Sequence, residues 1–447
     1  MRILFISYSF PPDAQVGGRR AARLCKYLPE FGIEPVVLSV EERYYESVDT
    51  SFPPPAGLEI VRTSMSPGIF DAYRWLKSFL HAAQTGGNGT NSVAPVQTIG
   101  GIRHRVIAML HSGEAERGWF RPASRAGLKL LRLSSFDALV SSGPPFVAHR
   151  VARRLKQHTG LPWLADFRDP WSLNPKTMEL PPLRRRLEHR MERSCVEGAD
   201  RVICNTQRMR TSFAESYPNQ PAEKFVTLPN GFEEITPPTL MPPRSDGKHI
   251  CLHLGDVYAG RRIDTFCEVL ARLVGEGSLN AEKLQVIFMG DTDPAQLAAA
   301  KRVAPQLADQ GILQFCRRLD WGLAQHHLWS ADLLLIFQGS HRNQIPAKFY
   351  EYLATGKPIF AVAEPGALSD ILEESGAGIS ADSRDPEMIA ARFLQAMRLP
   401  GRSPELAQQL MASRYHARVL AERLAGWLRD VRSPEAVKRG RAPEGSP

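Results

Sequence analysis

The 447-residue sequence contains no apolar run that approaches the roughly 18–20 residues needed to cross a bilayer as a helix. The chain starts with a strand-like segment, residues 2–6, which is too short for the apolar core of a signal peptide. No small-residue cleavage site follows this segment. We therefore expect a cytoplasmic protein without a membrane-spanning segment.

Cysteine pairs and metal-binding patterns are also missing. The six cysteines have no Cys-x-x-Cys spacing, which favours reduced and mostly buried thiols over a disulfide framework. His-Glu-x-x-His does not occur, and the adjacent His326 and His327 diverge on a helix. The string Asp291-Thr292-Asp293 is typical of a turn at this place. We expect no bound metal and no resident cofactor.

The balance of charge is positive, with a formal net charge of +9 and a pI of about 9.3. Such a balance favours anionic partners, although a modest positive charge can also serve solubility alone. No zinc-finger, RNP or basic-zipper pattern is present, so we do not expect nucleic acid as a partner.

Short apolar runs alternate with helical stretches along most of the chain. Short apolar strands separated by helices are typical of parallel sheets, and two such series predict an α/β fold with two doubly wound, Rossmann-like domains. The predicted strands are 3–7, 35–40, 138–141, 163–166, 201–204 and 225–228 in the first series, and 250–254, 285–289, 313–315, 333–337, 359–362 and 378–380 in the second.

Composition divides the chain further. A Pro-rich linker at 235–247 separates an N-terminal domain, 1–234, from a C-terminal domain, 248–414. Ligands of such sheets bind beyond the carboxyl ends of the strands, so both domains would face one cleft. Residues about 84–101 are rich in Gly, Asn and Ser and predict a mobile loop, while 432–447 predict a disordered tail.

Residues 344–358 carry the clearest functional pattern. Pro346 suits the start of a helix and Gly356 its end. The free N–H groups at the helix start, beside Lys348, form a site for an anion. Glu351 lies one turn further along the same face, where its carboxylate can accept hydrogen bonds from a ribose diol. Phosphate and ribose together indicate a nucleotide, although an amphipathic core helix with an incidental Glu fits the pattern too.

This segment resembles the nucleotide-sugar site of family 4 glycosyltransferases, which have the GT-B fold of two Rossmann-like domains. The resemblance implies that Glu351 binds the ribose of the donor. The family motif has another Glu eight residues earlier, where this chain has Asn343. An Asn can hydrogen-bond a sugar hydroxyl but brings no charge. The resemblance also implies that the helical segment 415–431 packs back on the first domain.

Three further loops suit a ligand that carries phosphates. Gly17 and Gly18 follow the first strand and let a ligand approach the main chain, although the dinucleotide fingerprint Gly-x-Gly-x-x-Gly is absent. Gly255 follows a strand of the second half. By resemblance, Arg261 or Arg262 after it would grip the diphosphate. The same resemblance would place Arg318 beside the base; a solvated basic turn is the alternative for these arginines.

A charged cluster, Asp166-Phe167-Arg168-Asp169-Pro170-Trp171, ends a strand of the first half. It resembles a signature of bacterial family 4 enzymes that act on surface polysaccharides. Asp166 or Asp169 would orient an acceptor hydroxyl or act as its base. A structural ion pair between Asp and Arg explains the cluster equally well.

Residues 183–195 predict a basic helix, in which Leu183, Leu187, Met191 and Cys195 recur every four residues. Such a helix can lie on an anionic membrane surface. A solvated helix on the first domain is the alternative.

Taken with the resemblance, these patterns imply a retaining, metal-independent glycosyltransferase. It would move a sugar from a nucleotide-diphosphate donor, with UDP favoured over GDP, to a hydroxyl of a glycan or lipid-linked acceptor in surface polysaccharide assembly. Arg261, Arg262 and Lys348 would stabilise the leaving diphosphate. Two alternatives remain: a GT-B protein that only binds or scaffolds partners, which Asn343 motivates, and a sugar-nucleotide epimerase.

Overall fold

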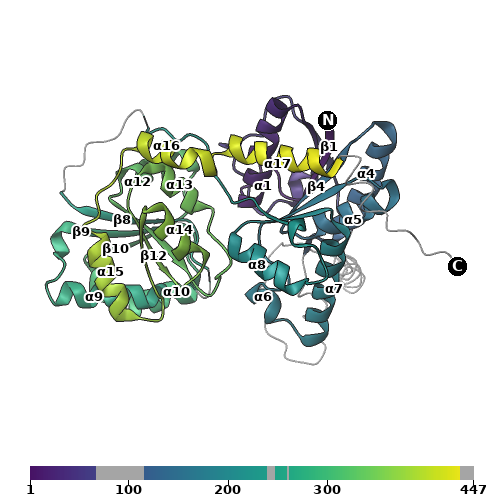
Figure 1. Cartoon of the computed structure of the whole chain (residues 1–447). Coiled ribbons are helices and arrows are strands. Elements are labelled where there is room, and N and C mark those ends of the chain that lie inside the picture. Colours follow the sequence, from purple (N-terminus) through teal and green to yellow (C-terminus); the bar gives the residue numbers. More distant parts are fainter. Residues whose placement is uncertain (67–114, 239–246, 259–260, 433–447) are drawn as a thin grey trace, which may run out of the picture.

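The structure, a computed structural model, describes residues 1–66, 115–238, 247–258 and 261–432. Two parallel β-sheets, one in each half of the chain, are each covered by helices (Figure 1). Together they form the two-domain α/β arrangement predicted from the sequence. The loop predicted at about 84–101 and nearly all of the tail predicted at 432–447 lie outside the described residues, as do residues 239–246 of the predicted linker.

The first sheet has the strand order β3-β2-β1-β4-β5-β6-β7, and all its strands pair in parallel. Its edge strand β3 was not predicted, because none of its residues is fully buried and polar Glu, Arg and Thr interrupt the apolar run. The strands are β1 (Arg2–Ser7), β2 (Glu34–Val40), β3 (Glu59–Thr63), β4 (Ala138–Gly143), β5 (Trp163–Phe167), β6 (Arg201–Cys204) and β7 (Phe225–Thr227).

Helices cover both faces of this sheet. On the inner strand β1, Leu4 and Ile6 face one apolar cluster, whereas Ile3 and Phe5 face another. Burial on both faces explains why the strand reads as a continuous apolar run. The helices of this half are α1 (Val16–Tyr27), α4 (Phe120–Leu133), α5 (Val147–Thr159), α6 (Pro175–Met178), α7 (Pro182–Gly198) and α8 (Gln207–Ser216), with 3-10 turns at Leu28–Phe31, Glu42–Tyr44, Ala115–Trp119 and Ala222–Lys224.

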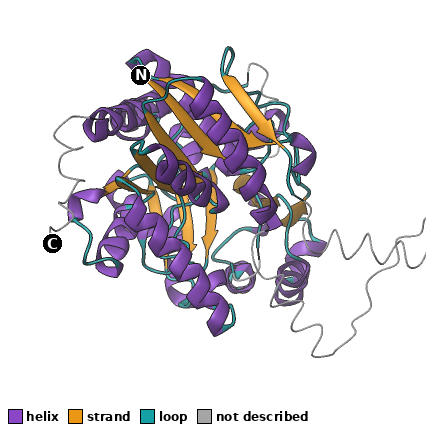
Figure 2. Ribbon diagram, turned by 90° about the vertical axis from the view of Figure 1, so that its right-hand side faces the viewer, coloured by secondary structure: helices purple, strands orange, loops and turns teal. Residues whose placement is uncertain are grey.

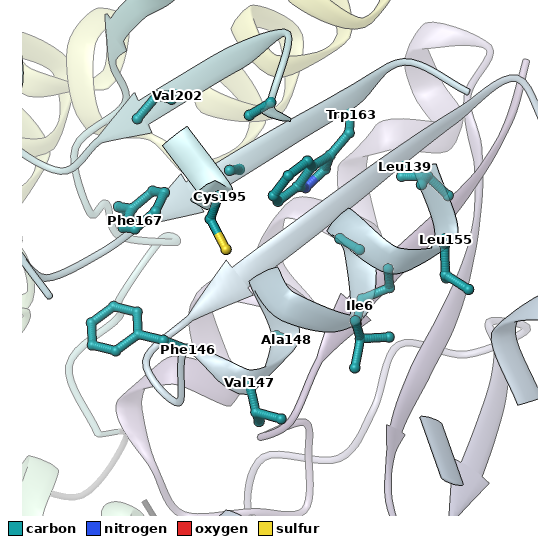
Figure 3. Close-up of a cluster of buried hydrophobic side chains, with 14 of the residues drawn as sticks. Ile6, Leu139, Phe146, Val147, Ala148, Leu155, Trp163, Phe167, Cys195 and Val202 are labelled. Atoms are coloured by element: carbon teal, nitrogen blue, oxygen red, sulfur yellow. The ribbon is translucent and has the colours of Figure 1, made fainter. Parts of the chain in front are cut away.

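The cluster on one face fills the space between this sheet and helices α4, α5, α7 and α8. Figure 3 shows part of it, with Trp163 and Phe167 of β5 beside Cys195 of α7. The indole N–H of Trp163 donates a hydrogen bond to Ser141 Oγ at 2.8 Å. The polar atom of this buried ring is therefore paired.

The second sheet has the order β10-β9-β8-β11-β12-β13, again with parallel pairing throughout. Figure 2, viewed from the side of the first half, shows strands of the protein with helices packed around them. The strands are β8 (His249–Leu254), β9 (Leu284–Met289), β10 (Leu313–Cys316), β11 (Leu333–Gln338), β12 (Ile359–Ala363) and β13 (Gly378–Ala381).

Helices of the second half also lie on both faces of their sheet. They are α9 (Ile263–Gly275), α10 (Pro294–Val303), α11 (Pro305–Asp309), α12 (Trp321–Ser330), α13 (Lys348–Thr355), α14 (Ala367–Ser375), α15 (Pro386–Ala396) and α16 (Pro404–Tyr415), with a 3-10 turn at Ala281–Lys283. A search of the described residues finds no helix long and apolar enough to cross a membrane.

The last helix, α17 (Ala417–Arg432), returns to the first half and lies along α1 (Figure 1). Its Leu420, Leu424 and Leu428 are buried in the same cluster as Ile3 and Phe5 of β1. The first half therefore completes its core with residues from the far end of the chain.

A buried ion pair fixes α1 to the first sheet. Arg20 donates to both carboxylate oxygens of Asp166, at the end of β5, over 3.0 and 2.8 Å. The same guanidinium donates to the carbonyls of Leu228 and Pro229 at 2.9 and 2.6 Å. Burial alone would raise the pKa of Asp166, but Arg20 and the hydroxyl of Ser142 hold it below its usual value.

We predict that Arg20→Ala lowers the free energy of unfolding by about 3–5 kcal/mol, because it leaves the Asp166 carboxylate buried without its counter-charge. Urea unfolding near neutral pH measures this loss. As Asp166 has a lowered pKa, the contribution of the pair is complete above the unfolded value of about 3.9 and disappears as pH falls through the folded value.

Glu374→Gln serves as the control, because Glu374 pairs with Arg414 where both side chains are 51% exposed. This substitution should cost at most about 1 kcal/mol. A similar small loss for Arg20→Ala would contradict the importance of the buried pair.

Candidate functional site

The carboxyl ends of the two sheets open onto one cleft of about 730 Å³. The first half contributes α1, the loop 46–49 and the turn at 230–231, and the second half contributes the loops after β8, β9 and β10 and the start of α13. Five of the predicted site residues line this cleft: Gly255, Arg261, Arg318, Lys348 and Glu351.

Helix α13 begins at Lys348, two residues after the predicted start at Pro346. The N–H groups of Phe349 and Tyr350 bond to the carbonyls of Pro346 and Ala347, so the chain already turns before the helix proper. The helix ends at Gly356, whose φ of 73° is the left-handed conformation that favours glycine. This short helix aims its first turn, with Lys348 and Glu351, into the cleft.

Lys348 reaches the cleft over Gly255. A Cβ atom at Gly255 would lie 2.8 Å from Lys348 Nζ, and its φ of 112° also favours glycine. Among the described residues, the hydrogen-bond partner of Lys348 Nζ is His253 Nε2, at 3.1 Å. Burial, followed by the positive charge of Arg261, holds the pKa of Lys348 well below its usual value.

Arg261 lies beside Lys348 with its guanidinium 4.8 Å from the ring centre of Tyr258. Burial lowers the pKa of Arg261. Its Nη1 is buried and has no hydrogen-bond partner within the described parts of the chain. Arg262, the other candidate, has a φ of 48°, precedes α9 and does not line the cleft. The structure therefore distinguishes the two arginines.

Arg318 and Glu351 are held by ion pairs at the cleft. Arg318 contacts Asp256 and is half-exposed. Glu351 Oε1 lies 3.4 Å from Arg23 Nη2 and 4.0 Å from Arg19 Nη1. Since both of these arginines lie on α1, the two halves of the protein meet through charge at Glu351.

Arg19 and Arg23 did not emerge from the sequence analysis. Their spacing of four residues places them on one face of α1, and this signal was available in the sequence. The partner of these arginines could not be predicted from the sequence, because Glu351 lies in the other half of the chain. The Arg19 guanidinium also lies 5.5 Å from the ring centre of Trp321, on the opposite wall.

Asn343 lies outside the cleft lining, between the two halves. Its carbonyl accepts a hydrogen bond from Thr206 Oγ1 at 2.6 Å, and its Nδ2 donates to Ser212 Oγ at 3.2 Å. The neighbouring Gln344 donates to Asp169 Oδ1 at 2.7 Å. Residues 343–344 therefore join the second half to the first.

The two aspartates of the charged cluster differ in their surroundings. Asp166 is 1% exposed and is engaged by Arg20 and Ser142. Asp169 is half-buried and accepts from Gln344; burial raises its pKa, which Arg168 partly opposes. Neither carboxylate lines the cleft.

Gly17 and Gly18 are buried on α1 and do not line the cleft. A Cβ atom at Gly17 would lie 2.4 Å from the Arg168 guanidinium, which itself donates to the carbonyl of Pro144. A Cβ at Gly18 would lie 3.2 Å from Phe10 Cα. Close packing within the first half accounts for both glycines.

Helix α7, which contains the predicted basic segment, has an unusual distribution of side chains. Leu183 and Leu187 are 66% and 45% exposed, although their spacing is that of an apolar face. The inward side is polar in its first part, where Arg184 pairs with Glu188, which accepts from Trp171 Nε1 at 2.8 Å. Further along, Cys195 and Val196 are buried in the apolar cluster. The exposed side also carries Arg185, Arg186, Arg190 and Arg193. It therefore combines apolar and basic groups.

The chain matches the family "Glycosyl transferase 4-like domain" over residues 17–231 and the family "Glycosyl transferases group 1" over residues 248–398. These matches cover both halves of the cleft. The chain belongs to the family 4-like glycosyltransferases, and its two facing Rossmann-like domains are the GT-B fold of that family, as the sequence predicted.

Two related proteins match part of the chain. It is 24% identical over 209 residues to the D-inositol 3-phosphate glycosyltransferase of Geodermatophilus obscurus, a match that covers 45% of this chain and 46% of that protein. It is 27% identical over 268 residues to WbjE, a probable glycosyltransferase of Pseudomonas aeruginosa, over 57% of this chain and 64% of that protein. The matches thus span less than two thirds of either relative.

Among solved structures, the chain is similar to Anabaena HepE in complex with UDP and glucose. The TM-score is 0.59 and the identity 14%, with 96% of this chain and 99% of that chain covered. At this identity the likeness shows a common fold.

We predict that Gly17→Ala lowers the free energy of unfolding by about 1 kcal/mol, because the new methyl group displaces the Arg168 guanidinium from its hydrogen bond to the carbonyl of Pro144. Gly275→Ala is the matched control on a helix, since no atom lies within 4 Å of the added Cβ. It should be neutral or stabilise the protein by up to about 1 kcal/mol. If Gly17→Ala keeps full stability and loses only ligand binding, the packing role is wrong.

Proposed function

We propose that this protein transfers a sugar from a nucleotide-diphosphate donor to a hydroxyl of an acceptor. The observation that carries this proposal is the pair Arg261 and Lys348. Both are half-buried at the cleft, and within the described residues neither has a carboxylate partner. Cations that are partly withdrawn from water without counter-charges are costly unless an anion joins them. A diphosphate bound at the positive end of α13 would supply that charge.

The same groups suit the chemistry of transfer. The bond between the sugar C1 and the diphosphate oxygen breaks, and the diphosphate leaves with both electrons. A new bond forms between C1 and the acceptor oxygen, whose proton is released. Arg261 and Lys348 would stabilise the charge that develops on the leaving diphosphate. This role needs no metal ion, and by analogy with the family we propose that the anomeric configuration is retained.

In this proposal Glu351 and the loop after β10 would hold the nucleoside. Glu351 lies one turn along α13 from Lys348, so that its carboxylate would reach a ribose diol while the helix start holds the phosphates. Arg318 and Trp321 at the other side of the cleft provide polar and aromatic surface for the base. We favour UDP over GDP, and the UDP complex of HepE, which shares the fold, supports this choice.

The acceptor would approach from the first half of the protein. Of the two aspartates there, Asp169 is the better candidate to orient a hydroxyl, because the Asp166 carboxylate is engaged by Arg20. We propose a glycan or lipid-linked acceptor in polysaccharide assembly. The exposed side of α7 fits an anionic membrane surface: its arginines complement lipid phosphates, and Leu183 and Leu187 are free to enter the interface.

We predict that Arg261→Ala and Glu351→Ala each weaken UDP binding by about 10- to 100-fold, the loss of a hydrogen bond to a charged group. Isothermal titration calorimetry measures the Kd, and release of UDP from a panel of UDP-sugars measures transfer. Arg262→Ala is the matched comparison: it removes the neighbouring arginine, which does not line the cleft, and should leave the Kd unchanged.

Equal losses in Arg261→Ala and Arg262→Ala would contradict the distinction between the two arginines. If the wild-type protein binds neither UDP nor GDP, the transferase proposal fails and a scaffold function gains support. A sugar nucleotide that changes without any acceptor would instead indicate an epimerase.

For the membrane surface, we predict that the wild-type protein floats with vesicles that contain phosphatidylglycerol and not with purely zwitterionic ones. The double variant Leu183→Ser/Leu187→Ser should bind at least about 10-fold more weakly, since each buried leucine is worth about 1.5–3 kcal/mol. Leu133→Ser on α4 is the control, because Leu133 is 71% exposed and lies on another helix. Equal flotation of all three proteins would contradict the role of α7.

A further inference from the structure

His253 is a buried polar residue in the middle of an apolar strand. It lies on β8, inside the second sheet, and is 0% exposed. Its ring centre lies 5.7 Å from that of Phe288 and 5.4 Å from that of Phe337. A leucine or methionine would fill such a space without a polar group to satisfy. The imidazole at this position therefore calls for an explanation beyond packing.

The hydrogen bonds of the ring determine where its proton lies. His253 Nδ1 is 2.9 Å from the carbonyl oxygen of Leu335, and a carbonyl only accepts. Nδ1 must therefore carry the hydrogen. Burial, and then the charges of Lys348 and Arg261, hold the pKa of His253 well below its usual value. The main-chain groups of Leu335 and Asp256 act in the opposite direction and raise the pKa, but by less. A neutral ring with its proton on Nδ1 leaves Nε2 as an acceptor.

That acceptor lies 3.1 Å from Lys348 Nζ. The charged groups around Lys348 are Arg261, which lowers its pKa, and Asp256 and Glu351, which act in the opposite direction. Asp256 is in contact with Arg318, and Glu351 with Arg23. The imidazole is thus the direct partner of the ammonium among the described residues, and it brings no negative charge.

A neutral partner has a consequence for an anion site. A carboxylate at position 253 would pair with Lys348, cancel its charge and compete with an incoming phosphate. An imidazole orients the ammonium and leaves the full charge available to the cleft. Gly255, two residues further on, provides the room that Lys348 needs to pass.

We propose that His253 is a positioning residue for the donor: its Nε2 accepts a hydrogen bond from Lys348 and holds the ammonium toward the diphosphate without neutralising it. This inference rests on the proposed function. It predicts that two properties of the residue at 253 matter separately. The acceptor at the position of Nε2 orients Lys348, and the neutrality of the side chain preserves the charge of Lys348.

Three substitutions separate these two properties. His253→Gln keeps a neutral acceptor near the position of Nε2 and should retain UDP affinity within about 3-fold. His253→Leu removes the acceptor and should weaken UDP binding by about 10-fold or more, as expected for a lost hydrogen bond to a charged group. His253→Glu adds a competing carboxylate and should weaken binding at least as much as His253→Leu. Calorimetry on the full chain gives each Kd.

Lys348→Met tests whether His253 acts through Lys348. In a double-mutant cycle, His253→Leu should have no further effect on the Kd once Lys348 is replaced. Cys251→Ala is the matched control, since Cys251 is buried on the same face of β8 and belongs to the apolar cluster there. This variant should lose stability and keep its UDP affinity, which separates general loosening of the strand from loss of the acceptor.

Two results would overturn the inference: an unchanged Kd in His253→Leu, or an equal loss with and without Lys348. Nitrogen-15 NMR of the imidazole ring tests the pair without any ligand, and so remains decisive even if UDP and GDP fail to bind and the proposed function falls. An unprotonated Nε2 signal between about pH 5 and 8, the range in which an ordinary histidine changes its charge, that shifts in Lys348→Met supports the pair. A ring that titrates normally, or a signal unaffected by Lys348→Met, refutes it.

Discussion

The ion pair between Arg20 and Asp166 determines how the first wall of the cleft is built. It anchors α1 to the end of β5 and, through two carbonyls, to the turn that leaves the first domain. Arg19 and Arg23, on the same helix, are thereby directed across the cleft to Glu351. A buried pair of this kind is not needed for net stability, since apolar residues often stabilise as much. Its geometric effect, a fixed orientation of α1, is what the cleft requires.

The cations of the cleft fall into two groups with different uses. Arg19 and Arg318 have carboxylates within ion-pair distance, so their charge is already balanced when the cleft is empty of ligand. Arg261 and Lys348 are half-buried with an aromatic ring and an imidazole as neighbours, and these neighbours leave their charge uncompensated. Balanced cations shape the cleft and link its walls, whereas uncompensated ones supply the attraction for an anionic ligand.

Much of the fold could be predicted from the sequence, because parallel strands buried on both faces are continuous apolar runs. The edge strand β3 is only partly buried, so it lacks this signal. Lys348 and Glu351 line the cleft, and the signal that singled them out in the sequence was their place at a helix start. Gly17 and Asn343 do not line it, since one packs against Arg168 and the other bonds to the first half. Local patterns indicate where a strand or helix ends. They do not indicate which side chains from distant parts of the sequence pack against a residue or form hydrogen bonds with it.

The position of α17 also affects the order in which the protein can fold. Its leucines share a core with the first strand, although they come from opposite ends of the chain. During synthesis the first domain emerges early, yet the face of its sheet that α1 covers lacks its second helix until α17 leaves the ribosome. Until then, apolar groups of β1 and α1 remain open to solvent and to other chains. The second domain also buries a residue of a late helix, Tyr415 of α16, so both cores are completed only after most of the sequence has been made.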